Sequence, residues 1–183
     1  RKFFRQVDAA LSQVLAESQD PLLVAGVDRN LAFFQEVSQR AGSVAGTLPG
    51  SYDSTSPAEL VARVWPLVEV HAAGQRQHAH AELEAAAAAG QIRAGLAAIW
   101  PAALDGRGAL LLVERDVHSP ALLTQDGRSL QPVANGVAVA DGEGFEDAVD
   151  EIIAIVLEKG GRVVFTANGR LEGYGRIALV LRY

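Results

Sequence analysis

The chain of 183 residues has a net charge of −6, and its 49% hydrophobic and 21% charged residues are typical of a globular protein rather than a disordered one. It has no cysteine, which excludes disulfides and thiolate metal sites, and no apolar run of the roughly 20 residues that a membrane span requires. Its sixteen cations are scattered along the sequence, which excludes DNA or a broad RNA surface and leaves open only a small local contact to RNA.

The first part of the sequence predicts an α/β layer. Residues 2–17 place apolar side chains at helical spacing, and the continuous apolar run at 21–27 is typical of a strand buried on both faces. Asp28 is expected to cap a second amphipathic helix. Residues 41–57 are rich in Gly, Ser and Pro and indicate a loop with at most one short edge strand.

Two further helices are predicted after this loop. Ser56 is a good N-cap, because proline follows it and Glu59 stands three positions later. Pro66 falls inside the apolar pattern of this helix and predicts a kink or a break. Residues 75–89 are rich in alanine, which has the best helix propensity, and the glycine that follows is a plausible stop.

The second half alternates helices with apolar strands and predicts an α/β sandwich, with helices covering a mixed sheet. An Asp-Gly pair between two apolar pieces suggests a hairpin. The predicted elements are a helix at 92–104, a strand at 109–113, the hairpin within 121–133, a helix within 145–158, a strand at 162–167 and a last strand at 176–183.

Several segments together carry a family pattern. PLLVAGVDRNLAFFQEVS, SPAELVARVWPLVE, GLAAIWPAALDGRGALLLVERD and DEIIAIVLEKGGRVVFTANGRLEGYGRIALVLRY resemble the bacterial relatives of the archaeo-eukaryotic class 1 peptide-release factors and Pelota. The closing pattern is the most specific part: a helix, two glycines, an apolar strand, a loop and a final strand that ends in Arg-Tyr. The Ala-Gly-Val turn after the first apolar strand is the next most specific.

The resemblance implies two domains. Residues 1–74 look like the later part of the release factors' middle domain, which has a ribonuclease-H-like fold. Residues 75–183 look like their C-terminal domain, an α-β-α sandwich. In that family a Gly-Gly-Gln loop catalyses peptidyl-tRNA hydrolysis and precedes the helix that corresponds here to residues 2–17, so it would lie before Arg1. We expect this chain to start inside a longer protein. No catalytic residue is therefore expected within the chain, and whether the protein is an enzyme stays open.

The stretch HAAGQRQHAHAE at 71–82 holds three of the four histidines and raises two chemical hypotheses. Its Ala-Gly-Gln, ending at Gln75, matches two-thirds of the catalytic motif but falls at the domain junction, where the family does not place that loop. His71 and His78 share a helix face, and His78 with Glu82 has a spacing that can hold zinc. Zinc needs three or four ligands, so we expect a solvated helix surface, with no metal and no cofactor.

The loop at 168–176 is the best candidate for contact with RNA or a partner. It combines two cations with an aromatic ring and with glycines that allow close backbone approach. A plain glycine-rich connection between two strands is the more frequent alternative. Glu114, Arg115 and Asp116 follow the strand at 109–113, at a carboxyl strand end where α/β sheets often bind ligands. The candidate residues are Arg115, Arg170, Tyr174 and Arg176.

The leading hypothesis is a non-enzymatic, cytoplasmic protein that associates with the ribosome or another translation component. The acidic balance favours protein contacts, because a protein interface needs no basic stripe. The alternative is a peptidyl-tRNA hydrolase whose glutamine loop lies upstream of this chain. A small-ligand-binding α/β protein is a third hypothesis, for which the sequence offers no fingerprint. Neither DNA nor a membrane is expected as a partner.

Overall fold

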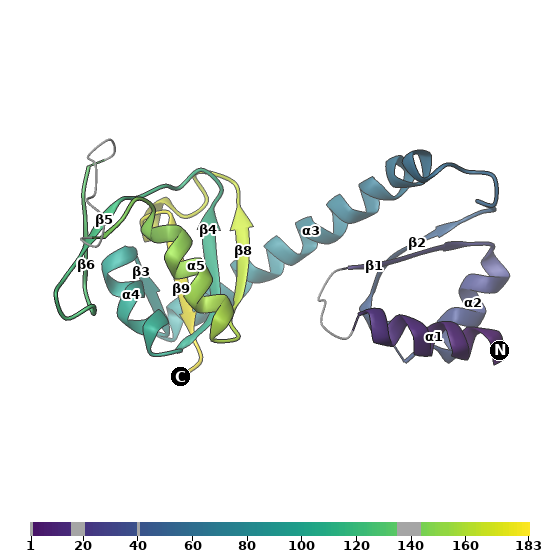
Figure 1. The fold of residues 1–183 in the computed structure, drawn as a ribbon, viewed down its shortest axis with the longest axis horizontal. Coiled ribbons are helices and arrows are strands. Elements are labelled where there is room, and N and C mark those ends of the chain that lie inside the picture. Colours follow the sequence, from purple (N-terminus) through teal and green to yellow (C-terminus); the bar gives the residue numbers. More distant parts are fainter. Residues whose placement is uncertain (1, 16–20, 40, 135–143) are drawn as a thin grey trace. The chain divides into compact units, whose positions relative to one another are not determined.

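The computed structural model describes residues 2–15, 21–39, 41–134 and 144–183. The chain divides into two compact units, Arg1–Gly74 and Gln75–Tyr183. Each unit contains helices and strands, so the predicted mixed α/β class is confirmed (Figure 1). Within the described residues, none of the helices combines the length and the apolar character that crossing a membrane demands.

The first unit is built on a two-stranded parallel sheet. The predicted strand at 21–27 forms, but none of its residues is buried: four residues of β1 are half-buried and Ala25 is exposed, because a single strand of the described chain pairs with it. Leu31 and Phe34 are the buried apolar residues of the second helix. The elements are α1 (Lys2–Val14), β1 (Leu22–Gly26), α2 (Asp28–Val37), η1 (Ala41–Ser43), β2 (Val44–Pro49) and the first part of α3 (Pro57–Ala88).

The two predicted helix caps of this unit have different outcomes. The cap at Asp28 is wrong: Val27 is the N-cap of α2 and Asp28 is the first helical residue, where its charge suits the helix N-terminus. The cap at Ser56 is confirmed. The Ser56 N–H donates to Glu59 Oε2 at 3.0 Å, and the Glu59 N–H donates to Ser56 Oγ at 3.3 Å, which is a reciprocal capping box.

α3 is a single helix of 32 residues. Pro66 was predicted to kink or to break the helix; a break does not occur, and the two helices expected on either side of the domain junction are one. A proline removes one hydrogen bond at a cost of roughly 3 kcal/mol, which a long run of good helix formers can offset. The predicted stop is confirmed: Gly90 has a φ of 71°, and the Gln91 N–H donates to the Ala86 carbonyl at 2.8 Å.

The second unit contains a four-stranded mixed sheet in the order β3-β9-β4-β8. β4 runs parallel to β8 and antiparallel to β9. The predicted last strand therefore lies in one sheet with the two apolar strands before it. The elements are β3 (Ile92–Ala94), α4 (Leu96–Leu104), β4 (Gly108–Glu114), β5 (Ala121–Leu123), β6 (Leu130–Pro132), β7 (Gly144–Phe145), α5 (Ala148–Glu158), β8 (Arg162–Thr166), η2 (Glu172–Tyr174) and β9 (Ile177–Leu181).

The helix predicted at 92–104 is wrong in its first turn. Ile92–Ala94 form the edge strand β3, which pairs antiparallel with β9. Gly95 then adopts a φ of 73°, which interrupts a regular helix, and α4 begins at Leu96. Backbone pairing with a distant strand therefore decides the conformation of these three residues.

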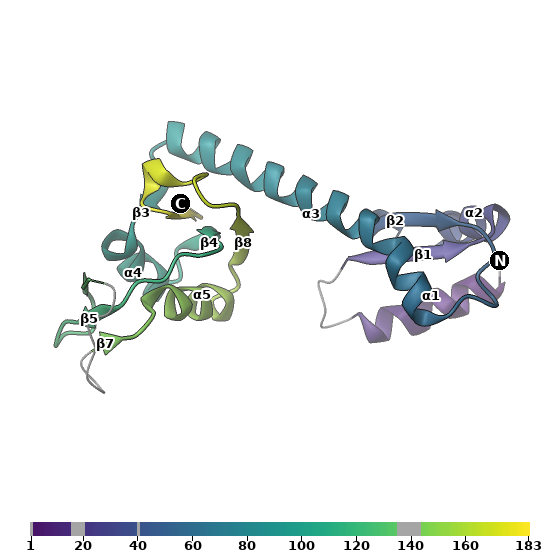
Figure 2. The same ribbon diagram turned by 90° about the horizontal axis from the view of Figure 1, so that it is seen from above.

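Helices cover both faces of this sheet (Figure 2). Alternate side chains of β4 point to opposite faces. Leu111 and Val113 pack with residues of α4 and α5, whereas Leu110 and Leu112 pack with Leu83 and its neighbours on α3. The result is the α-β-α layering expected from the sequence. The predicted hairpin also forms as β5 and β6, which join β7 in a separate three-stranded sheet.

The closing Arg-Tyr pair fixes the end of the sheet. Arg182 Nε donates to the Gly108 carbonyl at 3.0 Å, and Arg182 Nη2 donates to the Lys159 carbonyl, at the end of α5, at 2.8 Å. The Arg107 guanidinium lies 5.9 Å from the centre of the Tyr183 ring. The most specific part of the family pattern thus joins the last strand to a helix end and to β4.

Candidate functional site

The carboxyl ends of β4 and β8 lie side by side, because these neighbouring strands are parallel and Glu114 pairs with Thr166. The connection from β8 to β9, residues 167–176, begins at the same edge. In open α/β sheets this edge is where ligands commonly bind. We call the residues gathered there the strand-end site: Glu114, Arg115, Asp116, Asn168, Arg170, Tyr174 and Arg176.

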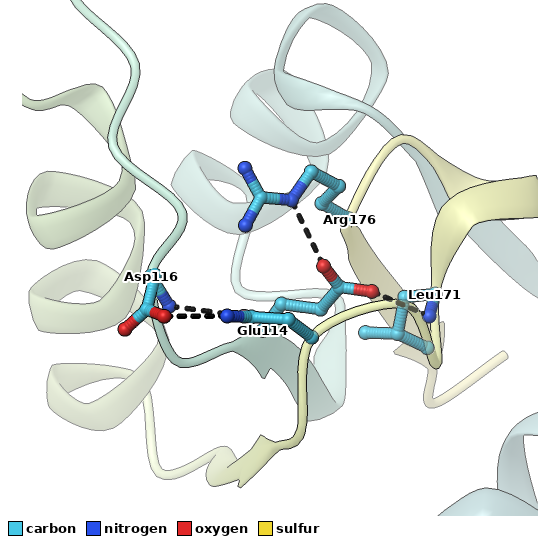
Figure 3. A network of polar contacts seen from close by, with 5 residues as sticks. Glu114, Asp116, Leu171 and Arg176 are labelled. Carbon is cyan, nitrogen blue, oxygen red and sulfur yellow. Dashed lines mark hydrogen bonds and ion pairs between the residues drawn. The ribbon is translucent and has the colours of Figure 1, made fainter.

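Glu114 is the buried centre of the site, with 1% of its surface exposed. Its carboxylate accepts hydrogen bonds from Arg176 Nε at 2.9 Å and from the Leu171 N–H at 2.7 Å (Figure 3). The Arg176 hydrogen bond is the largest influence on the pKa of Glu114. With the N–H groups of Leu171 and Gly169 it outweighs the desolvation that would raise the pKa, so the pKa is lowered. Glu114 is therefore an ionised anchor.

Arg176 is held in an unusual backbone conformation. Its φ of 69° is the left-handed region, and it is the one non-glycine residue of the described chain with a positive φ. Its N–H donates to the Leu171 carbonyl at 2.9 Å, and its own carbonyl accepts from the Glu114 N–H at 3.1 Å. Such a conformation costs of order 1–3 kcal/mol and persists where surrounding contacts determine it. The side chain stays 42% exposed, so the guanidinium is fixed through Nε and accessible beyond it.

A second tie joins the loops that follow β4 and β8. The Asp116 N–H donates to Asn168 Oδ1 at 3.3 Å, and Asn168 Nδ2 donates to an Asp116 carboxylate oxygen (Figure 3). The two loops are therefore bound to each other as well as to the sheet. This gives the exposed side chains on them a defined position.

The histidine-rich stretch lies entirely within α3, as expected for a helix, but it is solvated only in part, because Ala79 is buried and His80 is half-buried. His80 Nε2 is 2.8 Å from Thr166 Oγ1, so this histidine ties α3 to the end of β8. Desolvation lowers the pKa of His80, and the positive charge of Arg170 lowers it further. His78 is exposed. The described residues contain no group of three or more potential metal ligands.

The four residues singled out in the sequence stand in the two connections that leave this edge, Arg115 after β4 and Arg170, Tyr174 and Arg176 after β8. Arg115 and Arg170 are exposed, and the Arg115 N–H donates to the Thr166 carbonyl at 3.1 Å. Tyr174 is half-buried because its ring packs against the cluster that includes Leu83, so only part of the ring faces solvent. Asn168 and His80 were missed. Both act through partners 52 or more positions away, and no local spacing reveals such pairs.

The chemistry available here is recognition of anions rather than proton transfer. Arginine stays protonated at any physiological pH and only donates hydrogen bonds. A guanidinium whose orientation is fixed loses less entropy when it binds a carboxylate or a phosphate. The buried carboxylate of Glu114 is already satisfied by two donors. It serves to position Arg176.

Comparisons with known proteins agree on one group. Residues 1–107 match the model of bacterial archaeo-eukaryotic release factor family 3. No curated protein sequence matches the chain at a significant level. Among solved structures, the C-terminal domain of the peptide chain release factor from Methanosarcina mazei is 19% identical, with a TM-score of 0.51; the match covers 71% of this chain and 97% of that one.

Two longer relatives share the fold. Archaeal Pelota, solved as a model of ribosome-bound Pelota and ABCE1, is 18% identical with a TM-score of 0.63 over all of this chain and 49% of its own. Dom34 from S. cerevisiae, described as interacting with Hbs1, is 11% identical with a TM-score of 0.55 over all of this chain and 52% of its own. The chain spans about half the length of these two relatives. The resemblance seen in the sequence is confirmed at the level of the fold.

Proposed function

Because the chain belongs to bacterial archaeo-eukaryotic release factor family 3, we propose that it is a translation-associated protein that acts by binding rather than by catalysis. Residues 1–74 serve as the later part of a release-factor-like middle domain, and residues 75–183 serve as its C-terminal domain. The chain acts in the cytoplasm, on the ribosome or on a protein that works with it. RNA contact is local and confined to the strand-end site.

The observation that carries the proposal is the fixed guanidinium of Arg176. Arg115 and Arg170 add two exposed cations in the connections that follow β4 and β8, on an otherwise acidic chain. Three cations suffice for a few contacts to phosphates or carboxylates, although they are too few for a broad RNA surface. This arrangement suits a specific docking contact. The printed descriptions of two relatives, a ribosome-bound Pelota and a Dom34 that interacts with Hbs1, support a translational partner.

Cosedimentation with purified bacterial ribosomes tests the association. We expect the chain to pellet with ribosomes at about 50 mM salt and to be released as salt rises, because charge contacts to phosphates are weakened by counterions. A chain that stays in the supernatant at low salt would contradict the proposal. An unrelated protein of similar size and net charge controls for trapping in the pellet.

The alternative, a peptidyl-tRNA hydrolase, requires catalytic groups. Residues 1–183 contain no Gly-Gly-Gln sequence, and the strand-end site offers donors of hydrogen bonds rather than a nucleophile with its base. The test is release of the peptide from peptidyl-tRNA on ribosomes. Release by this chain alone would contradict the binding role.

A further inference from the structure

The connection from β8 to β9 is held against α3 from its start. The Arg170 N–H donates to the Ala167 carbonyl at 3.4 Å, so the chain makes a turn directly after β8. Leu171, the next residue, is 1% exposed and belongs to the apolar cluster that includes Leu83 of α3. The exposed side chain of Arg170 therefore starts from a backbone that is fixed between the end of β8 and α3.

His80 of α3 lies at this contact. Its Nε2 is 2.8 Å from Oγ1 of Thr166, the last residue of β8, and the imidazole is half-buried. Ala79, beside it in the sequence, is 1% exposed and belongs to the same apolar cluster as Leu171. Two neighbouring residues of α3 thus hold the strand end and the loop, which places the imidazole beside the start of the loop that carries Arg170.

The charges around His80 come from α3, from β8 and from the loop. Burial is the largest cause of the lowered pKa of His80, the positive charge of Arg170 lowers it further, and Glu84 of α3 acts in the opposite direction. The cation of β8, Arg162, forms an ion pair with Glu82 at 2.7 Å. Arg170 forms no ion pair within the described residues, so its charge is the uncompensated one near the imidazole.

The surroundings of Arg170 suit a nucleotide better than a lone carboxylate. Gly173 is exposed and has no atom within 4 Å of the position that a side chain would take, so a sugar or a phosphate can approach the backbone there. The ring of Tyr174 is half-buried and keeps part of its surface for a base. A cation, an open glycine and an aromatic ring within five positions of one loop are the contacts that single-stranded RNA uses.

An anion bound at Arg170 changes the electrostatics of His80. The guanidinium alone disfavours the imidazolium, whereas a negative charge beside the guanidinium cancels that repulsion. Linkage is reciprocal: if the anion favours the protonated imidazole, the protonated chain binds the anion more tightly by the same factor. A phosphodiester keeps one negative charge between about pH 5 and pH 8, so in this range the change in charge belongs to the protein.

We propose that the strand-end site binds a phosphodiester of RNA together with a proton, and that His80 is the residue that takes up the proton. The proposal rests on the proposed function, which gives this site a local RNA contact, and adds the dependence of that contact on pH. Affinity is highest below the pKa of His80 in the free chain. It falls as pH rises through the higher pKa that His80 has in the complex.

A short uridine oligonucleotide, hexauridylate, tests the linkage. NMR titration of the chain saturated with hexauridylate should move the midpoint of the His80 titration upward by about 0.5 pH unit relative to the free chain. Fluorescence anisotropy should then show affinity for hexauridylate about threefold higher at about pH 5.5 than at about pH 8. The two results must agree, because linkage makes them the same quantity.

Substitutions identify the group that carries the proton. His80→Gln keeps an uncharged side chain that can bond Thr166, and its affinity for hexauridylate should no longer depend on pH. His78→Gln is the matched control, because His78 is an exposed histidine two positions earlier on α3, and this variant should keep the gain at low pH. Arg170→Lys should also keep the gain, whereas Arg170→Gln should lose it. Circular dichroism at both pH values checks that each variant is folded.

Four outcomes would overturn the proposal. These are no detectable binding of hexauridylate at about 1 mM chain, equal affinity at the two pH values, a His80 titration that the oligonucleotide leaves in place or moves downward, and a gain at low pH that survives in His80→Gln. Ribosome association is measured separately and at constant pH. Pelleting with ribosomes together with any of these outcomes would sink the proton linkage alone and leave the proposed function standing.

Discussion

The strands of the two units have similarly apolar sequences, but their residues differ in how deeply they are buried. In β4 and β9 almost every residue is buried, because helices cover both faces and each strand has a neighbour on both sides. In β1 four residues are half-buried and Ala25 is exposed, and an apolar pocket of about 370 Å³ that opens to solvent lies among α1, α2 and β1. The comparison teaches that a continuous apolar run identifies a strand but not its burial, which depends on the number of strands and layers around it.

The largest expected effect is a difference between the two sheets in the stability lost when an apolar side chain is shortened. Leu112→Ala in β4 removes a side chain with 0% exposure and should lower the free energy of unfolding by about 2–5 kcal/mol. Val24→Ala in β1 removes a half-buried side chain and should cost roughly 1 kcal/mol or less. Urea denaturation followed by circular dichroism measures both. Equal losses would contradict the difference in packing.

Each unit also has a buried carboxylate that ties distant segments together. Glu114 holds Leu171 and Arg176, whereas Asp8 accepts from Ser38 Oγ and from the Gln39 N–H. Glu114→Gln should lower the melting temperature at pH 7 more than Asp8→Asn, because Glu114 is the more deeply buried and fixes a strained backbone. A larger drop in melting temperature for Asp8→Asn would contradict the stronger role assigned to Glu114.

The pH dependence sharpens the role of Glu114. Its folded-state pKa lies below the ordinary value, so it contributes stability above that value and loses the contribution as pH falls through the lowered folded pKa. Thermal melts of the wild type should therefore show a loss of stability on the acid side that Glu114→Gln lacks. Parallel acid slopes in the two proteins would argue against an ionised anchor.

The removal of a helix cap is expected to give a smaller difference in stability between the two units. Asp147 caps α5 and accepts hydrogen bonds from Val149, Ser119 and His118, whereas the capping box at Ser56 is exposed. Asp147→Ala should cost about 2 kcal/mol and Ser56→Ala about 1 kcal/mol or less. The midpoints of urea denaturation measure both losses, provided that the dependence of the unfolding free energy on urea concentration is unchanged. If Ser56→Ala lost more stability than Asp147→Ala, exposure of the cap would not determine the size of the loss.

The smallest expected effect concerns His80. NMR titration should give His80 a pKa below 6.5, because burial and the charge of Arg170 both disfavour its protonated form. Arg170→Gln should raise that pKa only part of the way, since desolvation is the larger cause. In the same experiment an unchanged pKa of His80 in the variant would mean that the charge of Arg170 does not act on His80.

Local signals explain which parts of the fold could be predicted from the sequence. The apolar runs of β4, β8 and β9 and the capping box at Ser56 depend on neighbouring residues, and these predictions are confirmed. β3 was missed because three residues become a strand only by pairing with β9. Of the kink or break predicted at Pro66, the break does not form, because the length of α3 outweighs one missing hydrogen bond.

The candidate site follows the same rule. Arg170, Tyr174 and Arg176 stand in one short loop, so composition alone brought them together. The partners that fix this loop come from distant parts of the chain. Glu114 at the end of β4 accepts from the Leu171 N–H across 57 positions, and Asp116, just after β4, bonds Asn168 across 52. His80 of α3 bonds Thr166, the last residue of β8, across 86 positions. Only the packing of helices and sheet creates these pairs. The sequence therefore indicated which cations to consider but not what fixes them.

Ribosome cosedimentation of site variants tests the central claim most directly. Arg170→Gln combined with Arg176→Gln should reduce pelleting at low salt about tenfold or more, whereas Arg63→Gln, which removes an exposed cation from the first unit, should have little effect. Wild-type binding by the double variant, in a protein that is still folded, would contradict a translational contact through the strand-end site.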